Sequence, residues 1–110
     1  MKTIKKWTQT DFLERLTELY SDNVEISKRK NGDYANEDDP FQNFRACQAM
    51  GIPSEVGLVV RMTDKLARIS NLIHREAKVA DESILDTLSD LANYAMILRM
   101  YLEQKQNENR

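Results

Sequence analysis

Two lines of charged residues at helical spacing are the feature of this sequence that could do chemistry. Asp86 and Asp90 lie one turn apart in ESILDTLSDLANYA, opposite the apolar side of a predicted helix. Arg61, Lys65 and Arg68 recur at i, i+4 and i+7 in RMTDKLAR, again away from the apolar side. Carboxylates hold Mg²⁺, and arginine and lysine bind phosphate oxygens. The lines therefore predict either a phosphate site beside a metal site, or interhelical salt bridges, or two solvated faces.

The acidic line also contains Glu82 and Asn93, and apolar residues continue it. Ile97 and Met100 follow on the same side of the helix, and Tyr94 flanks it. A helix that is apolar nearly all round is usually covered all round. Carboxylates at the mouth of a covered groove need a cation or a shared proton. Glu82, Asp86 and Asp90 are therefore candidate metal ligands, and Asn93 and Tyr94 are candidate ligand-binding residues.

Two further segments add candidates. Asp22 and Glu25 lie about one turn apart on the first predicted helix, and paired acids on two helices of a bundle can hold a divalent metal. The alternative for them is a solvated face. The loop KNGDYANEDDPFQNF contains Asp33, Tyr34 and Asn43, and aromatic and amide side chains can stack on a base and bind its edge. Its phenylalanines are instead typical anchors for a short helix, and its glycine precedes its acids, which excludes an EF-hand.

The elements that position these residues are predicted to be helices. Three glycines and two prolines divide the chain, and no alternating β pattern of useful length is present. The predicted helices cover 11–28, 41–50, 54–74 and 82–104, with Thr10, Ser54 and Asp81 as N-caps. In the first helix the apolar side that should join the core consists of Phe12, Leu13, Leu16, Leu19, Tyr20 and Val24. We therefore expect one all-α domain over 1–110, a small bundle of three long helices and one short one, with flexible ends at 1–9 and 104–110. A core this small favours completion by a second copy, as a homo-oligomer and most simply a dimer.

Composition excludes several function classes. The 110 residues carry a net charge of −2, which argues against a broad nucleic-acid-binding surface. One cysteine, Cys47, and one histidine, His74, can form neither an intrachain disulfide nor a zinc site. No apolar run approaches a membrane span, and the basic N-terminus lacks an apolar signal core. We therefore expect a cytoplasmic protein without a membrane partner.

Three stretches carry a resemblance to a family. KRKNGDYANEDDPFQNF, GLVVRMTDKLARISNLI and ESILDTLSDLANYAMIL together resemble small bacteriophage and prophage proteins that are associated with nucleotide modification. These proteins are similar in turn to MazG-like all-helical nucleoside triphosphate pyrophosphohydrolases. The resemblance covers roughly 25–98. It implies an all-α protein of a bacterial host cell that binds a nucleotide or a nucleotide-derived molecule.

The wider resemblance implies a reaction. With Mg²⁺ held by helix carboxylates, a nucleoside triphosphate would be hydrolysed to the monophosphate and pyrophosphate. Asp86 and Asp90 resemble the second of two acidic sets in these enzymes, and Asp22 and Glu25 are the candidates for the first. The MazG-like enzymes have two glutamates in the first set and fewer residues between the two sets. Lys65 and Arg68 would neutralise the phosphates, and the catalytic candidates Asp33 and Glu25 would orient the water. The alternative is a non-catalytic protein that sequesters a nucleotide or signal through Arg61, Lys65, Arg68 and the tyrosines.

Overall fold

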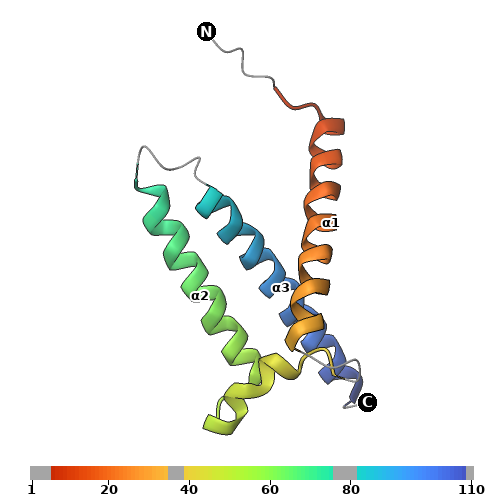
Figure 1. Ribbon diagram of the computed structural model, residues 1–110, viewed down its shortest axis with the longest axis vertical. Coiled ribbons are helices and arrows are strands. Elements are labelled where there is room, and N and C mark those ends of the chain that lie inside the picture. The colour runs from red at the N-terminus through yellow and green to blue at the C-terminus, as the bar shows by residue number, and fades with distance from the viewer. Residues whose placement is uncertain (1–5, 35–38, 76–81, 109–110) are drawn as a thin grey trace.

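The computed structural model describes residues 6–34, 39–75 and 82–108, with side chains for 6–30, 39–75 and 83–108. The elements in chain order are the α-helix α1 (Gln9–Tyr34), the 3₁₀-helix η1 (Gln42–Met50), and the α-helices α2 (Ser54–Ile73) and α3 (Glu82–Glu108) (Figure 1). The predicted all-α class, with three long helices and one short one, is confirmed. Within the described ranges, no helix has the length and apolarity that crossing a membrane requires.

Helix α1 begins earlier and ends later than predicted. The Thr8 N–H donates to Asp11 Oδ2 (3.0 Å), and the Asp11 N–H donates to Thr8 Oγ1 (3.1 Å). This reciprocal pair is a capping box, so Thr8 caps the helix and the prediction of Thr10 was wrong. At its other end α1 continues through Gly32 to Tyr34, since one glycine inside a helix costs only about 1 kcal/mol.

A tight turn joins η1 to α2. Gly51 has a φ of 78° and donates its N–H to the Gln48 carbonyl at 3.0 Å. The prediction of Ser54 as N-cap was wrong, because Pro53 occupies that position without a side-chain hydrogen bond. Ser54 is fully buried, and its Oγ accepts a hydrogen bond from Gln48 Nε2 at 3.0 Å. Ser54 therefore ties α2 to η1.

Helices α2 and α3 lie side by side in opposite directions and contain the core (Figure 1). Ile69 and Leu72 of α2 are buried against Ile84 of α3. Thr87 of α3 is also buried, although it was not predicted to be in the core. Asp81, the predicted N-cap of α3, lies outside the described residues, and α3 continues past Gln104 to Glu108. The flexible ends at 1–9 and 104–110 stay a prediction.

Helix α1 packs on α3 through its second half. Asn23 is buried, and its Nδ2 donates to the Ser89 carbonyl of α3 at 3.4 Å. The apolar residues of α1 that were predicted to join the core are instead exposed, which corrects that prediction: Phe12, Leu13, Leu16, Leu19, Tyr20 and Val24. Their periodicity marks a face that favours burial, but α2 and α3 bury their own core without it.

Candidate functional site

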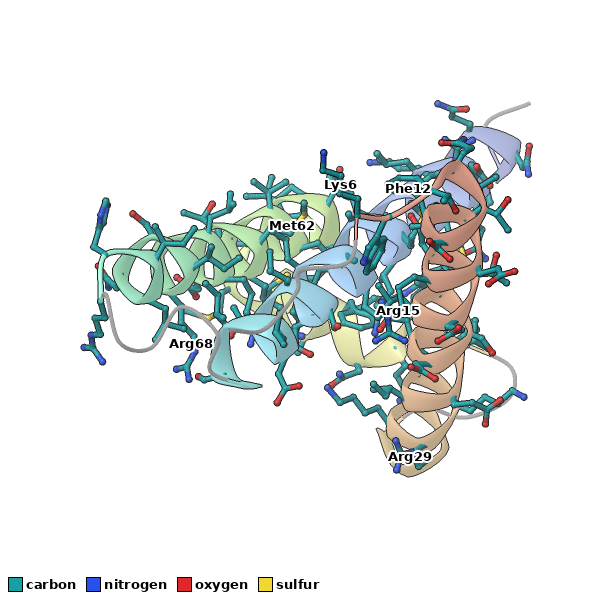
Figure 2. The ribbon with its side chains drawn as sticks, turned by 90° about the horizontal axis from the view of Figure 1, so that it is seen from above. Lys6, Phe12, Arg15, Arg29, Met62 and Arg68 are labelled. Carbon is teal, nitrogen blue, oxygen red and sulfur yellow. The ribbon has the colours of Figure 1, made fainter. Side chains whose placement is uncertain are left out.

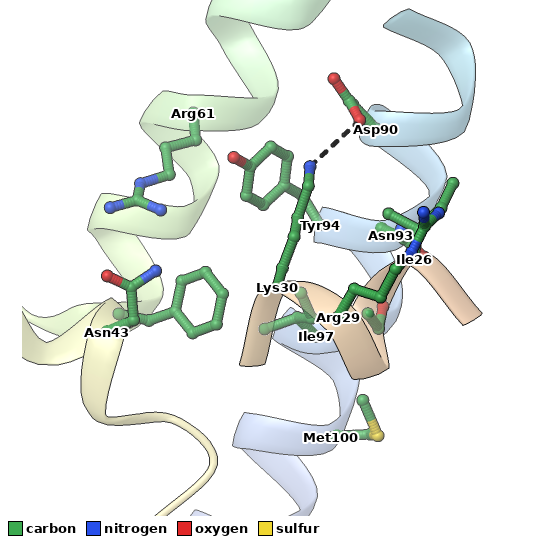
Figure 3. A pocket seen from close by; sticks show the side chains of 12 residues that line it. Ile26, Arg29, Lys30, Asn43, Arg61, Asp90, Asn93, Tyr94, Ile97 and Met100 are labelled. Atoms are coloured by element: carbon green, nitrogen blue, oxygen red, sulfur yellow. Dashed lines mark ion pairs between the residues drawn. The ribbon is translucent and has the colours of Figure 1, made fainter. Parts of the chain in front are cut away.

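All four helices contribute to one open cavity of about 530 Å³ (Figure 3). The volume lies in the range of small-molecule sites, about 300–1,000 Å³. The lining residues come from α1 (Ile26, Ser27, Arg29, Lys30), η1 (Asn43, Phe44), α2 (Arg61) and α3 (Asp90, Asn93, Tyr94, Ile97, Met100).

The charged side chains of the cavity are mostly cationic. Arg29, Lys30 and Arg61 line it, and Asp90 supplies the one carboxylate among the described side chains of the lining. The chain as a whole has a net charge of −2, so positive charge is concentrated here. Figure 3 shows Arg61 on one wall and Lys30 reaching from α1 toward Asp90 on α3. A concave cationic surface of this kind attracts anions.

Two aromatic rings position the Arg61 guanidinium. Its Cζ lies 5.3 Å from the centre of the Phe44 ring and 6.0 Å from the centre of the Tyr94 ring. The two rings meet edge to face, with centres 6.5 Å apart and planes at 89°. A cation over ring faces is attracted by their electron density and keeps its N–H donors available. No carboxylate of the described residues forms an ion pair with Arg61.

Asp90 is held between two lysines. Lys65 Nζ on α2 lies 3.1 Å from Asp90 Oδ2, and Lys30 Nζ on α1 lies 3.8 Å from Asp90 Oδ1. The side chains of Lys65 and Asp90 are 29% and 33% exposed, so water still screens the pair. The predicted acidic and basic lines therefore meet in an ion pair at the edge of the cavity.

The cavity also offers amide and apolar groups. Asn43 and Asn93 carry both hydrogen-bond donors and acceptors, which suit the edge of a base. Ile97 and Met100 lie at the end of the cavity away from Asp90 (Figure 3). One end can thus take an anionic group and the other a flat, less polar one.

Five of the predicted site residues line this cavity: Asn43, Arg61, Asp90, Asn93 and Tyr94. Lys65 is adjacent to them through its ion pair with Asp90. Arg68 does not. Its Nη2 donates to Ser83 Oγ (2.7 Å) and its Nε to Thr87 Oγ1 (3.2 Å), in a separate groove between α2 and the start of α3. Figure 2 shows Arg68 beside the first turn of α3, far from Arg29 on α1.

The predicted metal ligands do not converge among the described residues. Asp22, Glu25 and Asp86 are exposed, and Glu25 pairs with Lys28 on its own helix (3.1 Å). No group of three acids, histidines or cysteines in the described ranges is placed to hold a metal ion. The side chains of Asp33, Tyr34 and Glu82 lie outside the described ones. Mg²⁺ and the catalytic roles of Glu25 and Asp33 therefore stay predictions.

The lining residues that were not predicted as site residues include Arg29, Lys30 and Phe44. Arg29 and Lys30 belong to the basic run KRK near the end of α1, which is the one signal that could have indicated them. For Phe44 the sequence favours an anchor for the short helix. The side chain is buried as an anchor should be, but its ring also holds the guanidinium of Arg61.

A family model described as "nucleotide modification associated domain 1" matches residues 30–102. The chain belongs to this family. The part matched to nucleotide modification associated domain 1 includes η1, α2, most of α3 and every cavity residue from Lys30 onward. Neither the curated proteins nor the solved structures contain a match to the chain.

Proposed function

We propose that this domain binds a nucleoside phosphate in the cavity between its four helices. The observation that carries the proposal is Arg61: its guanidinium is held over Phe44 and Tyr94 at the cavity wall and has no carboxylate partner among the described residues. A guanidinium can donate two parallel hydrogen bonds to a phosphate. Lys30 and Arg29 add positive charge from the facing helix.

The rest of the cavity suits the remainder of a nucleotide. With the phosphates beside Arg61, the base would extend toward Asn43, Asn93 and the apolar side chains of Ile97 and Met100. Amide groups can hydrogen-bond the edge of a base, and apolar side chains can cover its face. The description of the family names the same class of molecule.

Turnover is a separate step of the proposal. The resemblance to MazG-like enzymes implies hydrolysis of a nucleoside triphosphate with Mg²⁺, and the alternative is binding without turnover. Asp90 is the one carboxylate among the described residues that line the cavity, and Lys65 and Lys30 already neutralise it. This arrangement favours nucleotide binding without turnover, since the described residues alone do not supply a set of carboxylates for Mg²⁺.

The test measures the thermal shift and the calorimetric affinity of a panel of nucleosides and of nucleoside mono- and triphosphates, with and without Mg²⁺. We expect the phosphates to stabilise the wild-type protein and the bare nucleosides to do so far less. Arg61→Met should weaken binding about 10- to 100-fold, because a hydrogen bond to a charged group is worth about 1.5–3 kcal/mol. Measuring pyrophosphate release in the same mixtures distinguishes an enzyme that hydrolyses a nucleoside triphosphate from a protein that binds it without turnover.

Arg99→Met is the matched control. Arg99 lies on α3 outside the cavity and pairs with Glu103 at 2.9 Å, so the substitution removes the same charge elsewhere. Its affinity for nucleotides should equal that of the wild type. If nucleosides bind as well as their phosphates, or if Arg61→Met and Arg99→Met behave alike, the cavity is not a phosphate site.

A further inference from the structure

Six large apolar side chains cover one side of α1 and are left in contact with water. We call them the α1 apolar face: Phe12, Leu13, Leu16, Leu19, Tyr20 and Val24. They fall within about 140° of the helix circumference. Each is 40–54% exposed, and all six lie on the same side of the helix, so they are not a scatter of single residues. Contiguous apolar patches of this kind mark interaction sites.

The first half of α1 is stabilised mainly by contacts within the helix itself. Arg15 pairs with Glu18, and Thr17 Oγ1 donates to the Leu13 carbonyl. Among the α1 side chains that the structure describes, 9–30, Asn23 is the only buried one. Isolated helices are marginal in water, and most helical stability in proteins comes from packing of the apolar side. A helix of 26 residues therefore needs a cover that the described parts of α2, α3 and η1 do not supply.

The α1 apolar face continues onto α3. Tyr20 and Val24 border a groove of about 520 Å³, whose other wall includes Met96 and Met100 of α3. These two methionines are 43% and 49% exposed. The uncovered surface thus spans two helices, as the side of a helical bundle does.

The surface area of the chain is too large for a compact monomer. A compact chain of this mass exposes about 6,300 Å², whereas this one exposes 8961 Å². Its radius of gyration is 17.1 Å, against about 13 Å for a compact domain of this length. The excess of about 2,700 Å² per chain exceeds the roughly 800 Å² that each partner hides in a standard interface. It lies at the upper end of the range for obligate homodimers, which bury about 1,000–2,500 Å² or more on each partner.

We propose that two copies of this chain pair through the α1 apolar face together with Met96 and Met100. A two-fold contact buries the same apolar residues of both copies against one another. Charge argues against a membrane surface as the occupant, because the other side of α1 carries Glu14, Glu18 and Asp22. Anionic lipid would repel these acids.

The test is the mass in solution, by light scattering and sedimentation over a range of concentrations. The wild type should have twice the chain mass of 12.8 kDa. Leu16→Lys and Leu19→Lys should each weaken association at least about 100-fold, because a buried unpaired charge costs several kcal/mol. Ser21→Lys adds the same charge about 140° around α1 from Leu16 and about 160° from Leu19. It lies about 60° outside the edge of the α1 apolar face at Val24, so it should leave the dimer intact.

A competing surface runs along the outer side of α2, where Val59 and Leu66 are 49% and 54% exposed. Leu66→Lys tests it with the same charge change. A wild type that is monomeric at every concentration overturns the proposal, as does a dimer that Leu66→Lys dissociates and Leu16→Lys does not. Circular dichroism checks that the variants remain helical, and Leu16→Ser replaces Leu16→Lys if that variant unfolds. The mass readout is independent of nucleotide binding.

Discussion

Lys65 of α2 and Asp90 of α3 form an ion pair, with Nζ 3.1 Å from Oδ2, at the edge of the cavity. Lys30 of α1 approaches the other carboxylate oxygen at 3.8 Å, so Asp90 links three helices. Because the pair is about one-third exposed, its direct contribution to stability is small, about 0–1 kcal/mol. Its larger effect is on the charge of the cavity, since it neutralises cations that would otherwise face an incoming phosphate.

Replacing Asp90 should therefore strengthen phosphate binding. Asp90→Asn removes one negative charge and releases Lys30 and Lys65 toward the ligand. A gain of about 1 kcal/mol corresponds to roughly five-fold tighter binding at low ionic strength, and added salt should reduce it. Calorimetric titration with a nucleoside triphosphate measures both effects.

Asp86→Asn is the control, since it makes the same charge change one turn away on an exposed side chain. It should alter affinity much less. The opposite result, in which Asp90→Asn abolishes binding only when Mg²⁺ is present, would identify Asp90 as a metal ligand instead.

The aromatic support of Arg61 gives a second prediction. Phe44→Leu removes the ring over which the guanidinium lies at 5.3 Å. A cation–π contact of about 0.5–1 kcal/mol corresponds to a two- to five-fold loss of nucleotide affinity. The substitution also shortens a buried side chain, so chemical denaturation should show a loss of about 1–2 kcal/mol.

Phe41→Leu separates the two effects. Phe41 packs edge to face on Tyr101 (5.7 Å between ring centres) and does not line the cavity. It should lower stability while nucleotide affinity stays at the wild-type value. Equal losses of affinity in both variants would mean that Phe44 acts only through stability.

The sequence predicted part of this site for a physical reason. Residues four apart share a helix face, so the acidic and basic lines could be paired from their spacing alone, and Lys65 does meet Asp90. Arg68 does not line the cavity, because the seven residues from Arg61 to Arg68 advance the helix by about 10 Å. That step carries Arg68 past the cavity to Ser83 and Thr87.

The predicted burial of the apolar residues of α1 was wrong for a different reason. Apolar periodicity in α1 predicts a face that favours burial, but periodicity does not say what buries it. Leu16 and Leu19 were therefore assigned to a core that α2 and α3 form without them. Arg29 and Lys30 were missed for the related reason that tertiary packing decides which end of α1 reaches the cavity.

Gly57 gives a third prediction, on the packing of η1 against α2. A Cβ at this position would lie 2.7 Å from Cys47 Sγ, which is too close for a real contact. Gly57→Ala should therefore destabilise the fold by about 1–3 kcal/mol through overpacking. The helix propensity of alanine offsets at most about 1 kcal/mol of this loss. Denaturant titration measures the net change.

The background variant Cys47→Ala removes the sulfur atom that the new Cβ would meet. In that background, Gly57→Ala should become neutral or stabilising, because only the helix propensity remains. A Gly57→Ala penalty that is the same in both backgrounds would show that Cys47 is not its cause.

The ends of α2 and α3 give a pH prediction. Lys105 Nζ donates to Glu55 Oε1 at 2.7 Å, which joins the first turn of α2 to the last turn of α3. This hydrogen bond lowers the pKa of the Glu55 carboxyl below its ordinary value of 4.5. The same contact raises the pKa of the Lys105 ammonium above its ordinary value of 10.5.

The two pKa shifts act at opposite ends of the pH dependence of stability, one in acid and the other in base. A lowered carboxyl pKa contributes stability above pH 4.5, and that stability is lost as the pH falls through the folded-state pKa. A raised ammonium pKa contributes stability below pH 10.5, and that stability is lost as the pH rises through the folded-state pKa. The melting temperature of Glu55→Gln should therefore fall less steeply on acidification than that of the wild type. Lys105→Met should abolish this difference, so Glu55→Gln should leave the acid limb unchanged in a Lys105→Met background. If Glu55→Gln flattens the acid limb equally in both backgrounds, Lys105 is not the cause of the Glu55 shift.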